Sequence, residues 1–215
     1  MTTLFSPYDL GGLSLPNRVA MAPMTRTRAG EHGVPTDLMR ENNDQRASAG
    51  LIVTDCTAVR EDSAGIMHAP GIYSEDQVDG WRGIVDGVHA AGGRIYLQIW
   101  HCGRISHPSL QPGGELPIAP SAVAAAGLIF TPEGRVPYPT PRMLDLSEIP
   151  PLIEAFGRAA GTAKRAGFDG VELHGAFGYV NAGLIPGQRG GVKPGQWVWD
   201  GDMQRAPIGA LCMSP

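Results

Sequence analysis

Polar and aromatic side chains follow four short apolar runs of this sequence. These groups occupy residues 22–25, 55–57, 98–101 and 174–175. They supply hydroxyl, amide, indole and imidazole groups, which can hold a polar ring or move a proton. If the apolar runs are strands of one sheet, the four groups belong to one site.

The segments around these groups predict such a sheet. Strands are expected at 18–22, 51–54, 94–100 and 170–174, with a helix in each interval. The first helix is expected from Thr36 to about Ala49, the second after the capping-box pattern at Ser74, and the third from Ser147 to Gly167. Repeated strand–helix units predict a parallel sheet, whose functional groups collect at the carboxyl ends of the strands.

Alternation along the strands predicts which side chains face the site. Tyr96, Gln98 and Trp100 share one face of the third strand, and the opposite face is apolar. Glu172 and His174 share a face of the fourth strand in the same way. We therefore expect Gln98 and Trp100 to point toward the mouth of the sheet.

Two segments do not fit the repeat. Residues 102–145 form a long insert rich in Gly and Pro, which we expect to fold over the mouth. Residues 181–215 are also rich in Gly and Pro and show no helical stripe, so no structure is assigned to them.

Composition excludes several classes of protein. The net charge is -4 and there is no basic run, which argues against nucleic acid as a partner. No window approaches 18 apolar residues, so no membrane span is expected. Three cysteines without CxxC spacing and the absence of a signal peptide favour a cytoplasmic location. Neither a GxGxxG nor a P-loop motif occurs.

Four stretches resemble the old yellow enzyme family of FMN-dependent ene-reductases, in the order and at the spacing of that family. They are LFSPYDLGGLSLPNRVAMAPMTRTRA (4–29), PTDLMRENNDQRASAGLIVTDCTAV (35–59), LQIWHCGRISHPS (97–109) and AGFDGVELHGAFGY (166–179). The resemblance implies an α/β fold, a truncated TIM-type barrel with strands one to four, an N-terminal β-hairpin and a long loop after strand three. Residues 1–180 would be the N-terminal half of that FMN-binding barrel, and 181–215 a divergent tail.

The resemblance also implies how FMN is held. The backbone of Pro23, Met24 and Thr25 and the amide of Gln98 would bind the pyrimidine edge of the flavin, and the Thr25 hydroxyl would adjust its potential. Cys56 stands where members of the family carry a small residue against the flavin. NADH or NADPH would be the transient reductant.

The substrate implied by the resemblance is a small electrophilic alkene, such as an enone. Trp100 would line its cavity, His174 would stabilise the oxygen that gains negative charge, and Tyr179 would protonate the α-carbon. Phe177 departs from the family pattern, because an Asn or His usually stands there and donates to the same oxygen.

A second departure supports an alternative function. Strands five to eight, and with them the expected phosphate site, have no counterpart in the sequence. The alternative is therefore a truncated, non-catalytic remnant that does not retain FMN. The open barrel edges predict self-association.

Simpler structural interpretations of these residues remain open. Gln98 and Trp100 could fill the barrel, His174 could be a core histidine, Cys56 a small buried residue and Thr25 a turn cap. A weak third hypothesis is a metal-dependent barrel hydrolase, which the histidines and Glu172 suggest. Their spacing matches no standard zinc pattern, so we expect no metal site.

Overall fold

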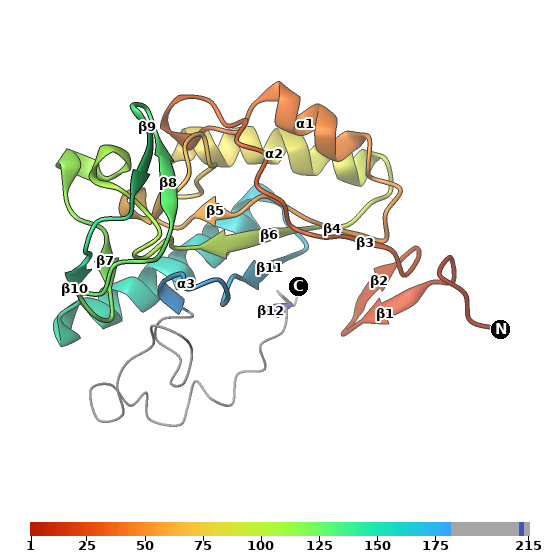
Figure 1. The fold of residues 1–215 in the computed structure, drawn as a ribbon. Coiled ribbons are helices and arrows are strands. Elements are labelled where there is room, and N and C mark those ends of the chain that lie inside the picture. Colours follow the sequence, from red (N-terminus) through yellow and green to blue (C-terminus); the bar gives the residue numbers. More distant parts are fainter. Residues whose placement is uncertain (182–210, 213–215) are drawn as a thin grey trace.

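A parallel sheet forms the centre of the protein. The computed structural model describes residues 1–181 and 211–212. Four parallel strands lie side by side in chain order (Figure 1): β3 (Ala20–Met21), β4 (Leu51–Val53), β6 (Ile95–Trp100) and β11 (Gly170–Leu173). This confirms the predicted strand order and the α/β fold that covers part of a barrel. The remainder of the 181–215 segment lies outside the described residues, apart from β12 (Leu211–Cys212), which pairs antiparallel with β11.

The strand register aligns the carboxyl ends. Ile52 of β4 pairs with Ile95 of β6, and Gln98 of β6 pairs with Glu172 of β11. A short strand, β5 (Thr57–Ala58), continues the β4 segment and pairs with the end of β6. The residues that follow each strand therefore reach the same edge of the sheet.

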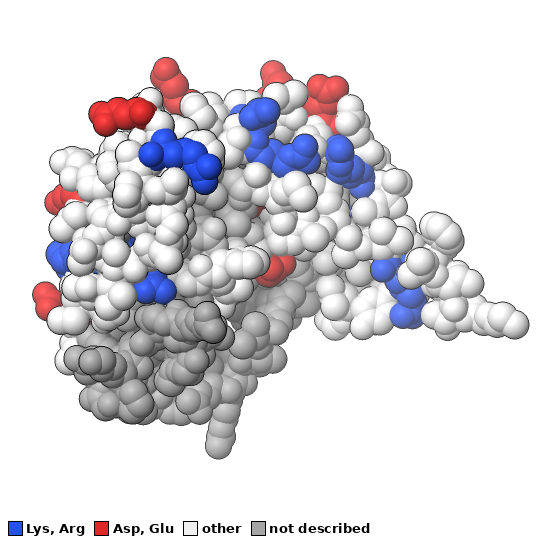
Figure 2. Space-filling model, viewed as in Figure 1, with Lys and Arg blue, Asp and Glu red and all other residues white. Residues whose placement is uncertain are grey.

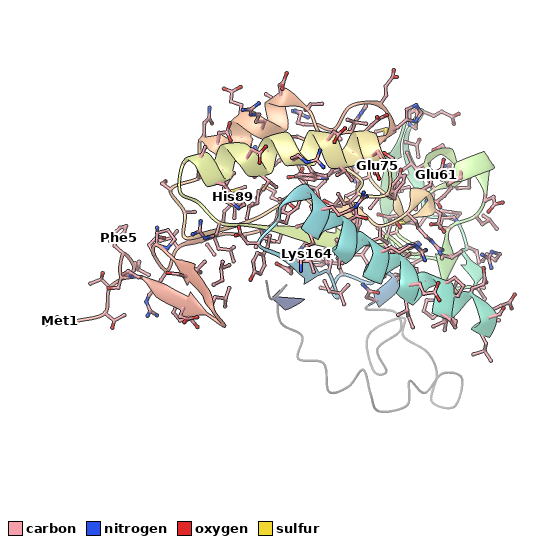
Figure 3. All side chains as sticks on the ribbon, turned by 180° about the vertical axis from the view of Figure 1, so that it is seen from behind. Met1, Phe5, Glu61, Glu75, His89 and Lys164 are labelled. Atoms are coloured by element: carbon pink, nitrogen blue, oxygen red, sulfur yellow. The ribbon has the colours of Figure 1, made fainter. Side chains whose placement is uncertain are left out.

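Three helices cover one face of the sheet (Figures 1 and 3): α1 (Asp37–Asp44), α2 (Glu75–Ala90) and α3 (Ile149–Ala166). The predicted capping box of α2 is confirmed, because Ser74 Oγ accepts from Gln77 N and Gln77 Oε1 accepts from Ser74 N. Gly167 ends α3 in the left-handed conformation, with φ 96°, as the sequence predicts.

The predicted start and end of α1 need correction. Thr36 precedes the helix, but its Oγ1 donates to Arg28 O at 2.7 Å instead of capping the first turn. The helix ends at Asp44 rather than near Ala49. The start of the third helix also differs, since Ser147 lies in a 3-10 turn, η5 (Leu146–Glu148), that leads into α3.

Apolar side chains pack on both faces of the sheet. On the outer face, Leu97 and Ile99 of β6 belong to one buried cluster with side chains of α2 and α3. On the inner face, Tyr96 packs with Leu51, Val53 and Leu15. Leu15 comes from the predicted N-terminal hairpin of β1 (Tyr8–Leu10) and β2 (Leu13–Leu15), which is confirmed. The alternation predicted for β6 is therefore correct.

Asp169 fixes α2 against the sheet. Its Oδ2 atom accepts from Ile95 N at 2.8 Å and lies 2.9 Å from Nε2 of His89, near the end of α2 (Figure 3). One carboxylate thus connects the start of β6, the end of α2 and the segment just before β11.

The long insert contains small elements of its own near the carboxyl ends of the strands (Figure 1). An antiparallel hairpin of β8 (Leu128–Thr131) and β9 (Gly134–Pro137) stands beside a parallel pair of β7 (Ile118–Ala119) and β10 (Arg142–Met143). Short 3-10 turns complete the connections: η1 (Glu31–Gly33), η2 (Glu61–Ser63), η3 (Pro108–Leu110) and η4 (Pro112–Gly114).

The outer edge of β3 has no partner strand among the described residues. Phe5 and Val19 are exposed beside it, around a hollow of about 540 Å³. The expected self-association through such an edge stays a prediction. Side chains of both signs mix along the visible face (Figure 2), and no helix within residues 1–181 is long and apolar enough to cross a membrane.

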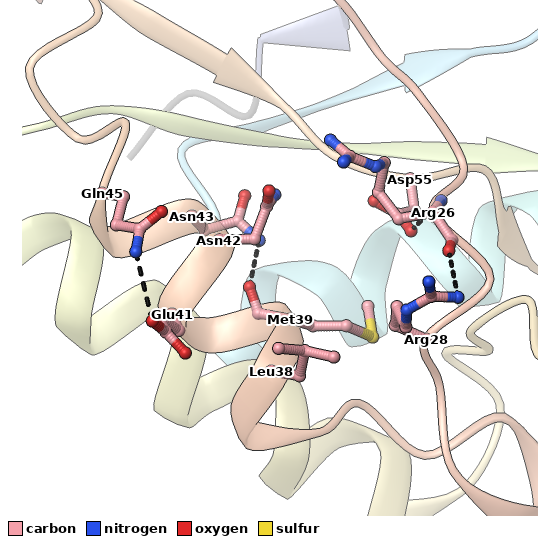
Figure 4. A pocket seen from close by; sticks show the side chains of 9 residues that line it. All are labelled: Arg26, Arg28, Leu38, Met39, Glu41, Asn42, Asn43, Gln45 and Asp55. Atoms are coloured by element: carbon pink, nitrogen blue, oxygen red, sulfur yellow. Dashed lines mark hydrogen bonds between the residues drawn. The ribbon is translucent and has the colours of Figure 1, made fainter.

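A polar pocket of about 230 Å³ lies between α1 and the segment after β3 (Figure 4). Asn43 lines this pocket and is only 2% exposed. Its Nδ2 atom donates to Met39 O at 2.8 Å, but its Oδ1 atom is buried without a hydrogen-bond partner. An unpaired buried acceptor destabilises the folded chain.

The substitution Asn43→Leu is expected to raise the free energy of unfolding by about 1 kcal/mol, because it removes this acceptor and keeps a similar volume. Urea unfolding followed by circular dichroism measures the change. Asn42→Leu is the matched control, since Asn42 lines the same pocket without an unpaired buried oxygen. Equal stability of the two variants would contradict the prediction.

Candidate active site at the carboxyl ends of the strands

Hydrogen bonds connect four residues across the carboxyl ends of the strands. Cys56 N donates to Thr25 Oγ1 at 3.2 Å, and Cys56 Sγ donates to Gln98 Oε1 at 2.8 Å. Gln98 Nε2 then donates to Glu172 Oε1 at 2.9 Å. We call Thr25, Cys56, Gln98 and Glu172 the polar row. It contains one residue from each of the four parallel strands or the segment directly after it.

The segment after β3 places the first member of the row. Thr25 is half-buried, and Met24 beside it is 62% exposed. The next residue, Arg26, donates its backbone N–H to Asp55 Oδ2 at 2.9 Å, which ties this segment to the loop after β4. Pro23, Met24 and Thr25 therefore lie where the sequence predicts them, along the edge of the sheet.

Cys56 acts in the row as a neutral thiol. Burial raises its pKa to about 11, and Asp55 and Glu172 add to the increase, while the Thr25 contact opposes it. The thiol thus keeps its proton at neutral pH and donates it to Gln98. This chemistry agrees with a small packing residue and does not suit a nucleophile.

Glu172 is the member of the row that the sequence did not assign to the site. Its alternation with His174 indicated an inward direction, but only the strand register reveals that it faces Gln98. The carboxylate accepts from the Gln98 amide and so fixes which end of that amide is the donor. Gln98 itself is only 4% exposed.

An aromatic cluster adjoins the polar row. The rings of Trp100 and Tyr179 meet edge to face with centroids 4.7 Å apart, and Tyr179 meets His174 at 4.8 Å. Cys56 connects the two groups, because it packs with Trp100 and Cys102, and Tyr179 lies against them. The structure thus brings together the residues predicted for cofactor and for substrate.

The protonation states of the cluster suit proton donation. Burial lowers the pKa of His174, against the opposing effect of Glu172, so the imidazole is neutral at pH 7. Its Nδ1 atom accepts from Ala176 N at 3.3 Å, which leaves the proton on Nε2. Burial raises the pKa of Tyr179 to about 12, with smaller contributions from Cys56, Tyr138 and Cys102, so the phenol keeps its proton.

Phe177 is 84% exposed beside His174, with ring centroids 5.8 Å apart. Its φ of 57° is left-handed, a conformation that Asn and Gly adopt more readily than Phe. The side chain offers no donor to the oxygen that His174 could bind.

Metal ligands are not gathered in this region. Within the described part of the chain, no group of three or more His, Cys, Asp and Glu side chains could hold a metal ion.

Comparison with known proteins identifies the family of this chain. Residues 3–186 match the NADH:flavin oxidoreductase / NADH oxidase family. The chain belongs to this family. The expected old yellow enzyme resemblance is confirmed, because an old yellow enzyme homologue from Zymomonas mobilis has a similar structure. Its TM-score is 0.79 at 46% identity, over 83% of this chain and 50% of that one.

Two further relatives are reductases by name. 12-Oxophytodienoate reductase 7 of Oryza sativa subsp. japonica is 45% identical over 181 residues, which is 82% of this chain and 46% of the relative. Morphinone reductase in complex with tetrahydroNAD gives a TM-score of 0.82 at 45% identity, over 89% of this chain and 54% of that one. The chain spans about half the length of these relatives. At the level of the family, a flavin with a nicotinamide reductant is confirmed as the cofactor chemistry.

Proposed function

We propose that this chain is part of an FMN-dependent ene-reductase and carries the residues that bind the flavin ring and the substrate. The observation that carries the proposal is the polar row directly beside the aromatic cluster, at one edge of the sheet. Residues 1–180 are proposed as the half barrel that bears this site. NADH or NADPH would be the reductant and a small alkene activated by a carbonyl or nitro group the substrate.

The polar row has the hydrogen-bonding capacity that the pyrimidine edge of a flavin needs. Thr25 Oγ1 accepts one bond and still carries its own hydrogen to donate. Gln98 uses one amide hydrogen and one oxygen lone pair within the row, which leaves a second of each. Together with the backbone of the exposed residue Met24, these groups fit the pyrimidine edge of FMN.

His174 and Tyr179 would carry the substrate chemistry. When bound, the flavin supplies hydride exchange between the nicotinamide and the β-carbon of the alkene. His174 would donate from Nε2 to the substrate oxygen as negative charge develops on it. Tyr179 would deliver its phenolic proton to the α-carbon, so that one hydride and one proton add across the double bond. Trp100 would line the substrate cavity beside them.

The relatives support this proposal. Two are named as reductases of 12-oxophytodienoate and morphinone, and the second was solved with tetrahydroNAD. The alternative, a non-catalytic chain that does not retain FMN, stays a prediction. Flavin content distinguishes the two functions.

To test the function, the chain is reconstituted with excess FMN and freed of unbound flavin by gel filtration. Anaerobic stopped-flow then follows flavin reduction by NADH or NADPH, and reoxidation by 2-cyclohexenone. His174→Ala and Tyr179→Phe are each expected to slow reoxidation about 100-fold, because they remove the oxyanion donor and the general acid. Tyr179→Phe should leave reduction by the nicotinamide unchanged.

His107→Ala is the control, since His107 lies in the insert and its ring Nδ1 contacts Ser109. Reoxidation at the wild-type rate in both test variants would refute the assignment of the site. A wild-type chain that elutes without flavin would support the alternative.

Phe177→Asn is expected to raise the rate of alkene reduction about tenfold and to strengthen phenol binding. The variant adds a second donor beside His174, which matters most where charge develops. It should also raise the free energy of unfolding by about 1 kcal/mol, because Asn tolerates the left-handed backbone. Stopped-flow, phenol titration and urea unfolding give the three values.

Phe5→Asn is the matched control for this variant, because Phe5 is also exposed but has no left-handed backbone. If Phe177→Asn changes neither reduction nor phenol binding while flavin is bound, residues 174–179 do not form the substrate site.

A further inference from the structure

His101 is a fully buried imidazole with no part in the proposed chemistry. It directly follows Trp100 at the end of β6 and is 0% exposed. Burial lowers its pKa, against the opposing effect of Asp62, so the ring is neutral. A buried polar ring is costly unless its contacts compensate for the lost water.

The two ring nitrogens of His101 have separate contacts. Nδ1 accepts from Gly103 N at 3.1 Å, so the proton lies on Nε2. Nε2 is 3.6 Å from Asp62 Oδ1, beyond hydrogen-bond distance, and has no hydrogen-bond partner among the described residues. Arg60 holds that carboxylate in turn, through Nε at 2.5 Å and Nη2 at 2.6 Å. Burial opposes ionisation of Asp62, but His101 and Arg60 outweigh it and lower its pKa to about 2. The Gly103 N–H that donates to Nδ1 thus fixes the tautomer with the proton on Nε2.

His101 closes a backbone turn. This turn contacts the segment that carries Tyr179. Val180 N donates to His101 O at 3.2 Å. Gly103 is left-handed, with φ 57°, and a Cβ there would lie 2.8 Å from Val180 N and 3.0 Å from Val180 Cα. Residues 101–103 therefore form a close-fitting seat for Val180, which we call the Val180 seat.

Val180 is the neighbour of Tyr179, the proposed proton donor. Tyr179 N donates to Ala176 O, and its ring rests against Trp100. We propose that His101, through the bond that its Nδ1 accepts from Gly103 N, is a positioning residue that holds the Val180 seat and thereby the Tyr179 ring against Trp100. The effect of His101 on catalysis rests on the proposed function. The effect of His101 on the position of Val180 does not, because it depends only on contacts within the chain.

The test measures the exchange rate of single backbone amides by NMR in the full chain. His101→Ala is expected to speed exchange of the Val180 amide at least tenfold relative to the Val85 amide in the core of α2. His101→Asn should restore the wild-type rate, because an Asn oxygen accepts from the backbone N–H two residues ahead. His107→Ala is the control: its Nδ1 accepts from Ser109 N at 3.2 Å in the same way, whereas the Val180 N–H donates to His101 O.

A second pair of variants tests the seat without altering His101. Gly103→Ala should speed Val180 exchange, because its methyl group displaces Val180. Gly113→Ala should not, since Gly113 has a similar φ of 62° but no atom within 4 Å of a built Cβ. The proposal would be overturned if the Val180 amide exchanged at the wild-type rate in both His101→Ala and Gly103→Ala. It would also be overturned if the exchange rates of the Val180 and Val85 amides rose by the same factor.

In the flavin-loaded protein, His101→Ala should slow reoxidation by 2-cyclohexenone at least tenfold and leave flavin reduction by the nicotinamide unchanged. Equal slowing of both half-reactions would overturn the positioning role. Absence of flavin from every variant would count against the proposed function alone, because the amide exchange rates still decide the role of His101.

Discussion

The candidate site depends on the register between β6 and β11. This register sets Gln98 opposite Glu172, and the hydrogen bond between them fixes the orientation of the Gln98 amide. A shift by one residue would turn Gln98 toward the helices and bring Leu97 or Ile99 into the site. The apolar packing of those two residues on α2 and α3 opposes such a shift. Apolar packing on the outer face of the sheet therefore stabilises the register that sets Gln98 opposite Glu172 on the inner face.

The position of Gln98 also connects the polar row to the aromatic cluster. Cys56 belongs to both, because its thiol donates to Gln98 while its side chain packs beside Trp100. Raised pKa values keep the protons of Cys56 and Tyr179 in place, and His174 stays neutral. The site thus contains several partly buried proton donors. Such donors suit a reaction that develops negative charge on a substrate oxygen.

Local sequence patterns predicted the strands, the capping box of α2 and the inward direction of Gln98, because each depends on residues near in the chain. Other features depend on distant contacts. The Gln98–Glu172 bond requires strand register, and the β8–β9 hairpin lies in an insert whose Gly and Pro content indicated only a loop. Thr36 did not cap α1, because Arg28 O offered its hydroxyl another partner. The left-handed Phe177 likewise follows from the loop around it and not from its own preference.

The polar row is proposed to hold the edge of the flavin ring. The most direct measurement is an NMR titration of the isotope-labelled chain with FMN, following backbone amides and the Gln98 side-chain amide. We expect saturable shifts at Thr25, Cys56 and Gln98, and a loss of these shifts in Gln98→Leu. Shifts confined to the pocket between α1 and the segment after β3, or no saturable shift at any FMN concentration, would contradict it.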